Sequence, residues 1–265
     1  MKYSRKPAFR RDARFQRRPG SGGSTQRAGV EGGVILYGWH TVTAALANPA
    51  RRIRKLWATE NAVRRLAEEG IALPAERELV RPDAIAARLS PDAVHQGLLA
   101  EADPLSAPAL EELTAAGIVL VLDQITDPHN VGAILRTAAA FAVGAIVTTA
   151  RHSPEATGVL AKSASGALEH VPIVIVQNLA RALASLKEQG ILVIGLDSDA
   201  PEDLAAIKLS APLALVLGAE GKGLRQGTKA ACDRLARLDL PGAIKSLNVS
   251  NAAALSLYVA TRGQN

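Results

Sequence analysis

The sequence predicts an α/β protein whose C-terminal part holds a parallel sheet, and two observations carry this prediction. From about residue 117 onward, short continuous apolar runs alternate with helix-patterned stretches. Apolar runs without polar alternation are typical of parallel strands that helices cover on both faces. Aromatic residues make up only 3% of the chain, so the core must be built from Ala, Val, Leu and Ile.

The elements expected in this part follow one another along residues 117–265. The apolar runs predicted as strands are Ile118–Leu122, Ala145–Thr149, Val171–Val176, Ile191–Leu196, Leu213–Leu217 and Leu235–Leu240. Stretches with helical periodicity lie between them or close the chain. They are found near Val131–Phe141, Ala156–Leu168, Leu179–Glu188, Arg225–Ala231 and Asn251–Thr261. Ser250 or Asn251 is the expected cap of the last helix.

Residues 34–103 predict a small α/β domain of their own. They combine strand-like runs at 34–36, 53–59 and 97–100 with helix-like stretches at 40–46, 61–70 and 82–89. Four cations lie within five positions, namely Arg51, Arg52, Arg54 and Lys55. This cluster is expected to form either a phosphate-binding patch or a solvated strand edge. Residues 104–116 contain two prolines and are expected to form a linker followed by a short helix.

The basic charge of the chain is concentrated at its start. Residues 1–33 carry nine Lys and Arg against two acids, a net charge of +7, whereas 34–103 are neutral and 104–265 carry −1. This segment is rich in Gly and Ser and lacks a hydrophobic period, so we expect a disordered tail. It predicts an electrostatic arm for a polyanion such as RNA or DNA, with a solubilising or transit-like extension as the alternative.

Composition also limits the class of protein. The chain has one cysteine, Cys232, which excludes a disulfide framework and a multi-cysteine metal site and is consistent with a reducing compartment. No apolar run reaches the roughly 20 residues that a membrane helix needs. The first residues are polar and basic without an apolar segment of the secretory type. We therefore expect a soluble, cytoplasmic protein.

Three segments of the C-terminal part contain residues that a plain parallel sheet does not require. The first predicted strand is followed by Asp123–Asn130 (DQITDPHN), which contains no glycine-rich phosphate motif. The glycines come after a later strand, in Leu217–Leu224 (LGAEGKGL), with Glu220 among them. The third segment is Leu240–Asn251 (LPGAIKSLNVSN). Within it, Ser246 and Asn248 precede the expected helix cap, and they are either functional residues or part of the local turn chemistry.

Taken in order, Asp127–Ala138, Leu217–Leu224 and the Leu240–Ser250 region resemble the three motifs of the SpoU/TrmH family of RNA ribose 2′-O-methyltransferases, in the SPOUT superfamily. The resemblance extends to the first domain. Tyr37–Val42 and His95–Gly97 resemble the start and end of the RNA-binding domain in the subfamily that methylates a guanosine of 23S ribosomal RNA. Only the basic tail and the linker fall outside the resemblance.

The resemblance implies a catalytic domain over residues 117–265 whose parallel sheet is tied in a deep trefoil knot, an exception to the usual unknotted topology. It also implies a homodimer with its site at the subunit interface, S-adenosylmethionine as methyl donor, and no metal. The cofactor-binding positions that match are Gly218, Leu240 and Leu247. The segment between Pro241 and Ser246 is about two residues shorter than is usual in the family.

The matching catalytic positions are Asn130, Arg136, Glu220, Ser246 and Asn248. The family assigns Arg136 to activation of the ribose hydroxyl, but a guanidinium stays protonated in proteins and is a poor base. We expect Arg136 to hold a phosphate or to stabilise the developing alkoxide. Asn130 is expected to cap its helix or bind the ribose. Glu220 either accepts the hydroxyl proton or orients Arg136 across the interface, while Ser246 and Asn248 line the site.

Two other functions remain open from the sequence. A transfer-RNA ribose methyltransferase of the same family would use the same three motifs, but such enzymes usually lack the N-terminal domain. A catalytically silent RNA-binding factor for ribosome assembly would keep the fold and lose the site. The joint presence of the five catalytic positions favours the enzyme.

Overall fold

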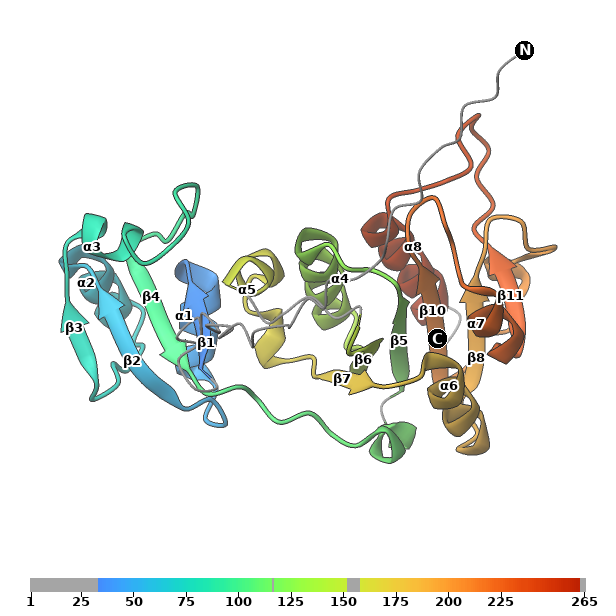
Figure 1. Cartoon of the computed structure of the whole chain (residues 1–265), viewed down its shortest axis with the longest axis horizontal. Helices are drawn as coiled ribbons and strands as arrows, with labels where there is room; N and C mark the ends of the chain where they lie inside the picture. The colour runs from blue at the N-terminus through green and yellow to red at the C-terminus, as the bar shows by residue number, and fades with distance from the viewer. Residues whose placement is uncertain (1–32, 116, 152–157, 263–265) are drawn as a thin grey trace, which may run out of the picture. The chain divides into compact units, whose positions relative to one another are not determined.

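The computed structural model describes residues 33–115, 117–151 and 158–262 and contains two separate β-sheets (Figure 1). The predicted basic tail, residues 1–33, lies outside the described residues except for Gly33. The first sheet is formed within residues 34–102 and the second within 118–237.

The first sheet has four strands in the order β1-β4-β2-β3. Its elements are β1 (Val34–Tyr37), α1 (Trp39–Ala47), β2 (Ile53–Ala58), α2 (Glu60–Glu68), β3 (Arg77–Leu79), α3 (Pro82–Ala86) and β4 (Leu98–Ala102). Strand β4 pairs antiparallel with β1 and β2, and β3 runs parallel to β2. The sequence analysis missed β3 because all three of its residues are exposed and form no hydrophobic pattern.

The second sheet has seven strands in the order β7-β6-β5-β10-β8-β11-β9, and every pair in it is parallel. Its strands are β5 (Ile118–Asp123), β6 (Ala145–Thr149), β7 (Ile173–Val176), β8 (Leu192–Leu196), β9 (Glu202–Asp203), β10 (Leu213–Gly218) and β11 (Arg234–Arg237). The predicted α/β fold class with a parallel sheet is confirmed. Passage of the chain through a knot stays a prediction of the resemblance.

Helices cover both faces of this sheet (Figure 1). They are α4 (Pro128–Ala140), α5 (Gly158–Ala164), α6 (Leu179–Glu188), α7 (Gln226–Ala231) and α8 (Val249–Arg262), with short 3-10 turns η1 (Leu110–Ala115), η2 (Ala167–Glu169) and η3 (Leu204–Ala206). In β5, Leu120 packs with α4 and α8, whereas Val119 packs with α6. Because both faces are buried, the strand reads as one continuous apolar run.

Helix α8 begins at Val249, two residues before the expected start, and this corrects two expectations. The backbone N–H of Ser250 donates to Asn248 Oδ1 at 2.9 Å, so Asn248 caps the helix in place of Ser250 or Asn251. Asn248 therefore has a local structural role, which was the alternative to a functional one. Strand β11 ends at Arg237, earlier than predicted, because the following residues belong to a loop.

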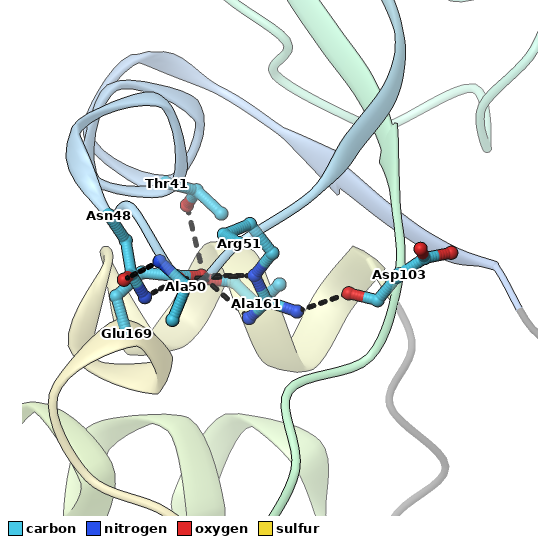
Figure 2. Close-up of polar contacts among 7 residues, drawn as sticks. All are labelled: Thr41, Asn48, Ala50, Arg51, Asp103, Ala161 and Glu169. Atoms are coloured by element: carbon cyan, nitrogen blue, oxygen red, sulfur yellow. Dashed lines mark hydrogen bonds and ion pairs between the residues drawn. The ribbon is translucent and has the colours of Figure 1, made fainter.

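A buried polar cluster joins the first sheet to the helices of the second (Figure 2). Arg51, in the turn before β2, pairs with Glu169 of η2 at 2.7 Å, and their side chains are only 4% and 3% exposed. Asn48 Nδ2 also donates to Glu169, at 2.8 Å, and Arg51 donates to the carbonyl oxygen of Asp103 at 2.8 Å. Arg51 thus belongs to neither a phosphate patch nor a solvated edge.

Around this cluster, helix α1 packs closely against residues 161–166. Thr41 donates to the carbonyl oxygen of Ala161 at 3.1 Å, and Ala161 belongs to the hydrophobic core of the first sheet. A Cβ atom on Gly166 would lie 2.8 Å from the Cβ of Ala44, so only glycine allows α1 to pack there. The two sheets therefore share packed contacts, and the division at residues 103 and 117 into separate domains stays a prediction.

Candidate active site

Three residues that the sequence analysis selected from three distant segments meet at the start of α8. Asn248 Nδ2 donates to Asn130 Oδ1 at 3.0 Å and to Glu220 Oε1 at 2.5 Å. The backbone N–H of Val249 donates to the same Glu220 oxygen at 3.1 Å. We call Asn130, Glu220 and Asn248 the amide–carboxylate cluster. It places one carboxylate at a helix N-terminus, where backbone N–H groups favour negative charge.

Asn130 does not cap its helix, contrary to one of the two roles expected for it. The cap of α4 is Asp127, whose side chain accepts the backbone N–H of His129 at 3.0 Å, and Pro128 begins the helix. The Asn130 side chain is thereby left for the cluster. His129 Nδ1 lies 3.3 Å from Ser163 Oγ of α5, so this ring contacts α5 and not the cluster.

Arg136 is not brought to the cluster within one chain. It lies six residues after Asn130 on α4, which places it about 9 Å further along the helix axis and about 120° around it. Its side chain is exposed and, within the part of the chain that the structure describes, makes no ion pair or hydrogen bond. Its guanidinium is therefore available to a ligand or to another copy of the chain.

A cavity of about 350 Å³ opens at the carboxyl ends of β8 and β10, beside the cluster. Its walls include five predicted site residues, namely Gly218, Glu220, Leu240, Ser246 and Leu247. Two loops supply half of the lining residues, the turn after β10 and the loop before α8. The structure thus brings all three predicted cofactor positions to one cavity, of a size typical for small-molecule sites.

The backbone of the following turn leaves no room for a side chain at Gly218. A Cβ atom here would lie 2.2 Å from the carbonyl carbon of Gly223 and 2.5 Å from the backbone nitrogen of Leu224. The turn also closes with the N–H of Gly223 donating to the carbonyl oxygen of Ala219 at 2.8 Å. Position 218 therefore requires glycine because the backbone at Gly223 passes so close to it.

Gly218→Ala should destabilise the protein even without any cofactor, because the new Cβ atom must displace backbone. We expect a loss of about 1–3 kcal/mol in the free energy of unfolding, the usual cost of overpacking, measured by urea denaturation. Gly227→Ala is the matched control, since a Cβ atom there meets nothing within 4 Å and lies in α7. Equal stability of the two variants would contradict this account of the turn.

The lining of the cavity also contains an ion pair that was not predicted from the sequence. Asp197, directly after β8, pairs with Lys229 of α7, and both line the cavity. Burial acts to raise the pKa of Asp197, but hydrogen bonds from Lys229 and from the backbone of Asp199 outweigh it and hold the pKa below its usual value. An acid immediately after a buried parallel strand was the available signal, since ligands bind at that edge.

The cysteine is not part of this site. Cys232 follows α7, and burial, with Asp233 nearby, raises the pKa of its thiol to about 11. The thiol is therefore protonated at neutral pH and is a poor nucleophile. Within the described ranges, no group of three or more His, Cys, Asp or Glu is arranged to hold a metal ion, and no helix is long and apolar enough to cross a membrane.

Comparisons with known proteins agree with this geometry. The profile of the SpoU rRNA methylase family matches residues 117–258, and that of the RNA 2′-O ribose methyltransferase substrate-binding family matches residues 35–108. The chain is 38% identical to the 23S rRNA (guanosine-2′-O-)-methyltransferase RlmB of Pseudomonas putida, over 86% of this chain and 95% of the relative. It is 41% identical to RlmB of a Burkholderia species, over 86% and 96%.

Solved structures show the same fold. A TrmH-family protein from Porphyromonas gingivalis superimposes with a TM-score of 0.74 at 28% identity, over 88% of this chain and 90% of that one. The SpoU methyltransferase AviRb from Streptomyces viridochromogenes gives a TM-score of 0.75 at 21% identity, over 87% and 90%. At that identity the likeness concerns the fold alone.

Proposed function

The chain belongs to the SpoU rRNA methylase family, and from this premise we propose that it methylates the ribose 2′-hydroxyl of a guanosine in 23S ribosomal RNA, with S-adenosylmethionine as methyl donor. The family profiles cover both sheets, and the relatives named for this reaction match most of the chain. The observation that carries the proposal is the meeting of Asn130, Glu220 and Asn248 beside the cavity.

The cavity suits the proposed donor. Its wall at Gly218, Leu240 and Leu247 comes from tight turns, whose main-chain N–H and C=O groups can bind adenine and a methionine chain. Asp197 and Asp199 line the same cavity together with Glu220 and three lysines, so groups of both charge signs are available to the sulfonium, the amine and the carboxylate of the donor. S-adenosylmethionine, when bound, supplies a methyl group already activated by its sulfonium.

We assign the remaining chemistry to the cluster and Arg136. Two donors occupy Glu220 Oε1, which fixes the carboxylate and leaves Oε2 to accept the proton of the ribose hydroxyl or to orient an arginine. Asn130 and Asn248 hold this carboxylate, and Ser246 faces the donor from the cavity wall. Arg136, always protonated, stabilises the oxygen as it loses its proton.

We further propose that the enzyme is a homodimer and that Arg136 reaches the site of the other subunit. Within one chain Arg136 is exposed and away from the cluster. Large apolar side chains are exposed near the same elements, Leu255 and Tyr258 on α8 at 43% and 46% and Ile244 in the preceding loop at 77%. In the proposed homodimer these side chains would be covered by the partner subunit.

The proposal is tested with the purified protein, methyl-labelled S-adenosylmethionine, 23S rRNA and bulk transfer RNA. We expect label in 23S rRNA, resistant to alkali at one guanosine because a methylated 2′-oxygen cannot attack the adjacent phosphate. Label confined to transfer RNA would favour the transfer-RNA enzyme. Tight RNA binding without transfer of label would favour the silent assembly factor.

The basic tail, which lies outside the described residues, is proposed to add RNA affinity and no chemistry. Deleting residues 1–33 removes a charge of +7. Fewer phosphate contacts release fewer counterions, so the truncated protein should bind RNA more weakly and with a flatter dependence on salt. Turnover at saturating RNA should change little. Normal binding with much slower turnover in filter-binding and rate assays would contradict this role.

A further inference from the structure

A second cleft, of about 430 Å³, lies at the carboxyl ends of β6 and β7 and has no part in the chemistry described above. We call it the edge cleft. It is lined by Thr149, Arg151, Gln177, Asn178, Leu179, Ala180, Arg225, Gly227 and Thr228. We propose that the edge cleft binds a backbone phosphate of the substrate RNA, close to the methylated nucleotide. This inference rests on the proposed function, since it assigns a subsite for the same substrate.

The edge cleft is next to the cofactor cavity along one continuous segment. Gly218 to Gly223 line the cofactor cavity, and Arg225, Gly227 and Thr228 line the edge cleft a few residues later. Both openings lie at the same edge of the sheet, because β6, β7, β8 and β10 run parallel and each contributes its carboxyl end. An RNA strand whose ribose enters the catalytic site would therefore pass near the edge cleft.

Arg225 is fixed in place by a buried acid. Asp123, the last residue of β5, is 0% exposed, and its Oδ1 accepts Arg225 Nε at 2.7 Å and lies 2.7 Å from the NH2 nitrogen. Its Oδ2 accepts the backbone N–H of Arg225 at 3.0 Å. The guanidinium has five N–H donors, so three remain for a ligand, and its side chain is 40% exposed. A preoriented, partly exposed guanidinium is the usual partner of phosphate.

The other lining groups suit the same anion. Among the residues that the structure describes, the charged ones that line the cleft are Arg151 and Arg225, and none of the lining residues is a carboxylate. Thr228 is only 2% exposed, yet it lines the cleft, and no described residue hydrogen-bonds its hydroxyl. Asn178 Oδ1 caps α6 by accepting the N–H of Arg181, which leaves its amide N–H₂ as a donor. These are donor groups that bind phosphate oxygens without reading a base.

The test uses the full-length protein and a 23S rRNA transcript, with dissociation constants measured over a series of salt concentrations. Arg151→Gln should weaken binding and lower the slope of log affinity against log salt by about 0.7 to 0.9, the value for one phosphate contact. Lys208→Gln is the charge-matched control, because Lys208 is exposed and precedes β10 at its other end. It should change neither quantity.

A second variant separates the cleft from general surface charge. Thr228→Val removes one uncharged donor and should weaken RNA binding by about threefold to tenfold, with the salt slope unchanged. Thermal unfolding checks that both variants fold. Unchanged affinity for Thr228→Val, or equal effects of Arg151→Gln and Lys208→Gln, would overturn the proposal. Because binding is the readout, this result is independent of whether the wild-type protein transfers a methyl group to 23S rRNA.

Discussion

Arg136→Ala should lower the single-turnover rate of methylation by roughly 10²-fold or more, the scale of removing one preorganised donor to a developing negative charge. The loss should fall on the rate and hardly on RNA affinity, because the charge on the ribose oxygen appears only in the transition state. Affinity for S-adenosylmethionine should stay near wild type, since Arg136 does not line the cofactor cavity. Single-turnover assays at saturating RNA measure this directly.

Two further variants define what Arg136 supplies. Arg136→Lys should recover little activity, because a point charge cannot reproduce a planar guanidinium with paired donors. Arg181→Ala, which removes another exposed arginine from the same domain, should leave the rate unchanged. A wild-type rate for Arg136→Ala at saturating RNA would limit Arg136 to binding and would refute its role in the chemistry.

Glu169→Ala should strongly destabilise the protein, by about 3–5 kcal/mol in the free energy of unfolding, because it leaves the buried Arg51 cation without its partner. The same substitution removes the acceptor of Asn48 Nδ2. Replacing both Arg51 and Glu169 by methionine should recover much of the stability, since no buried charge remains unpaired. Urea denaturation of the three proteins gives the comparison.

An exposed ion pair provides the control for this prediction. Glu202 and Arg234 pair at 2.6 Å, but their side chains are 41% and 44% exposed. Water solvates either partner when the other is removed, so Glu202→Ala should change stability far less. If the Glu169 and Glu202 variants lose equal stability, the cluster in Figure 2 is not the energetic link between the two sheets.

The strands of the second sheet could be predicted because both faces are buried, which leaves an apolar run that is visible in the sequence. Strands β3 and β9 could not, since they have three and two residues and no buried periodicity. Arg51 appeared as one of four crowded cations. Its burial depends on Glu169, which is 118 residues away, and no local pattern encodes that pairing.

The same limit applies to the candidate site. Asn130, Glu220 and Asn248 were selected from their segments, but their hydrogen bonds to one another depend on how α4, β10 and α8 meet. The resemblance selected Gly218 as a cofactor position, but the clash that a Cβ atom would make with Gly223 depends on how the turn closes and is not visible in the sequence. The position of Asp197 directly after a buried strand was visible in the sequence, but its pairing with Lys229 was not, because the two residues are distant along the chain.

We propose above all that this chain methylates the ribose 2′-hydroxyl of one guanosine in 23S rRNA. Mapping 2′-O-methyl groups at nucleotide resolution, in ribosomal and transfer RNA from cells with and without the chain, tests it most directly. We expect one guanosine of 23S rRNA to lose its 2′-O-methyl group when the chain is absent and to regain it with the wild-type protein but not with Arg136→Ala. An unchanged 23S rRNA pattern, or a loss confined to transfer RNA, would contradict it.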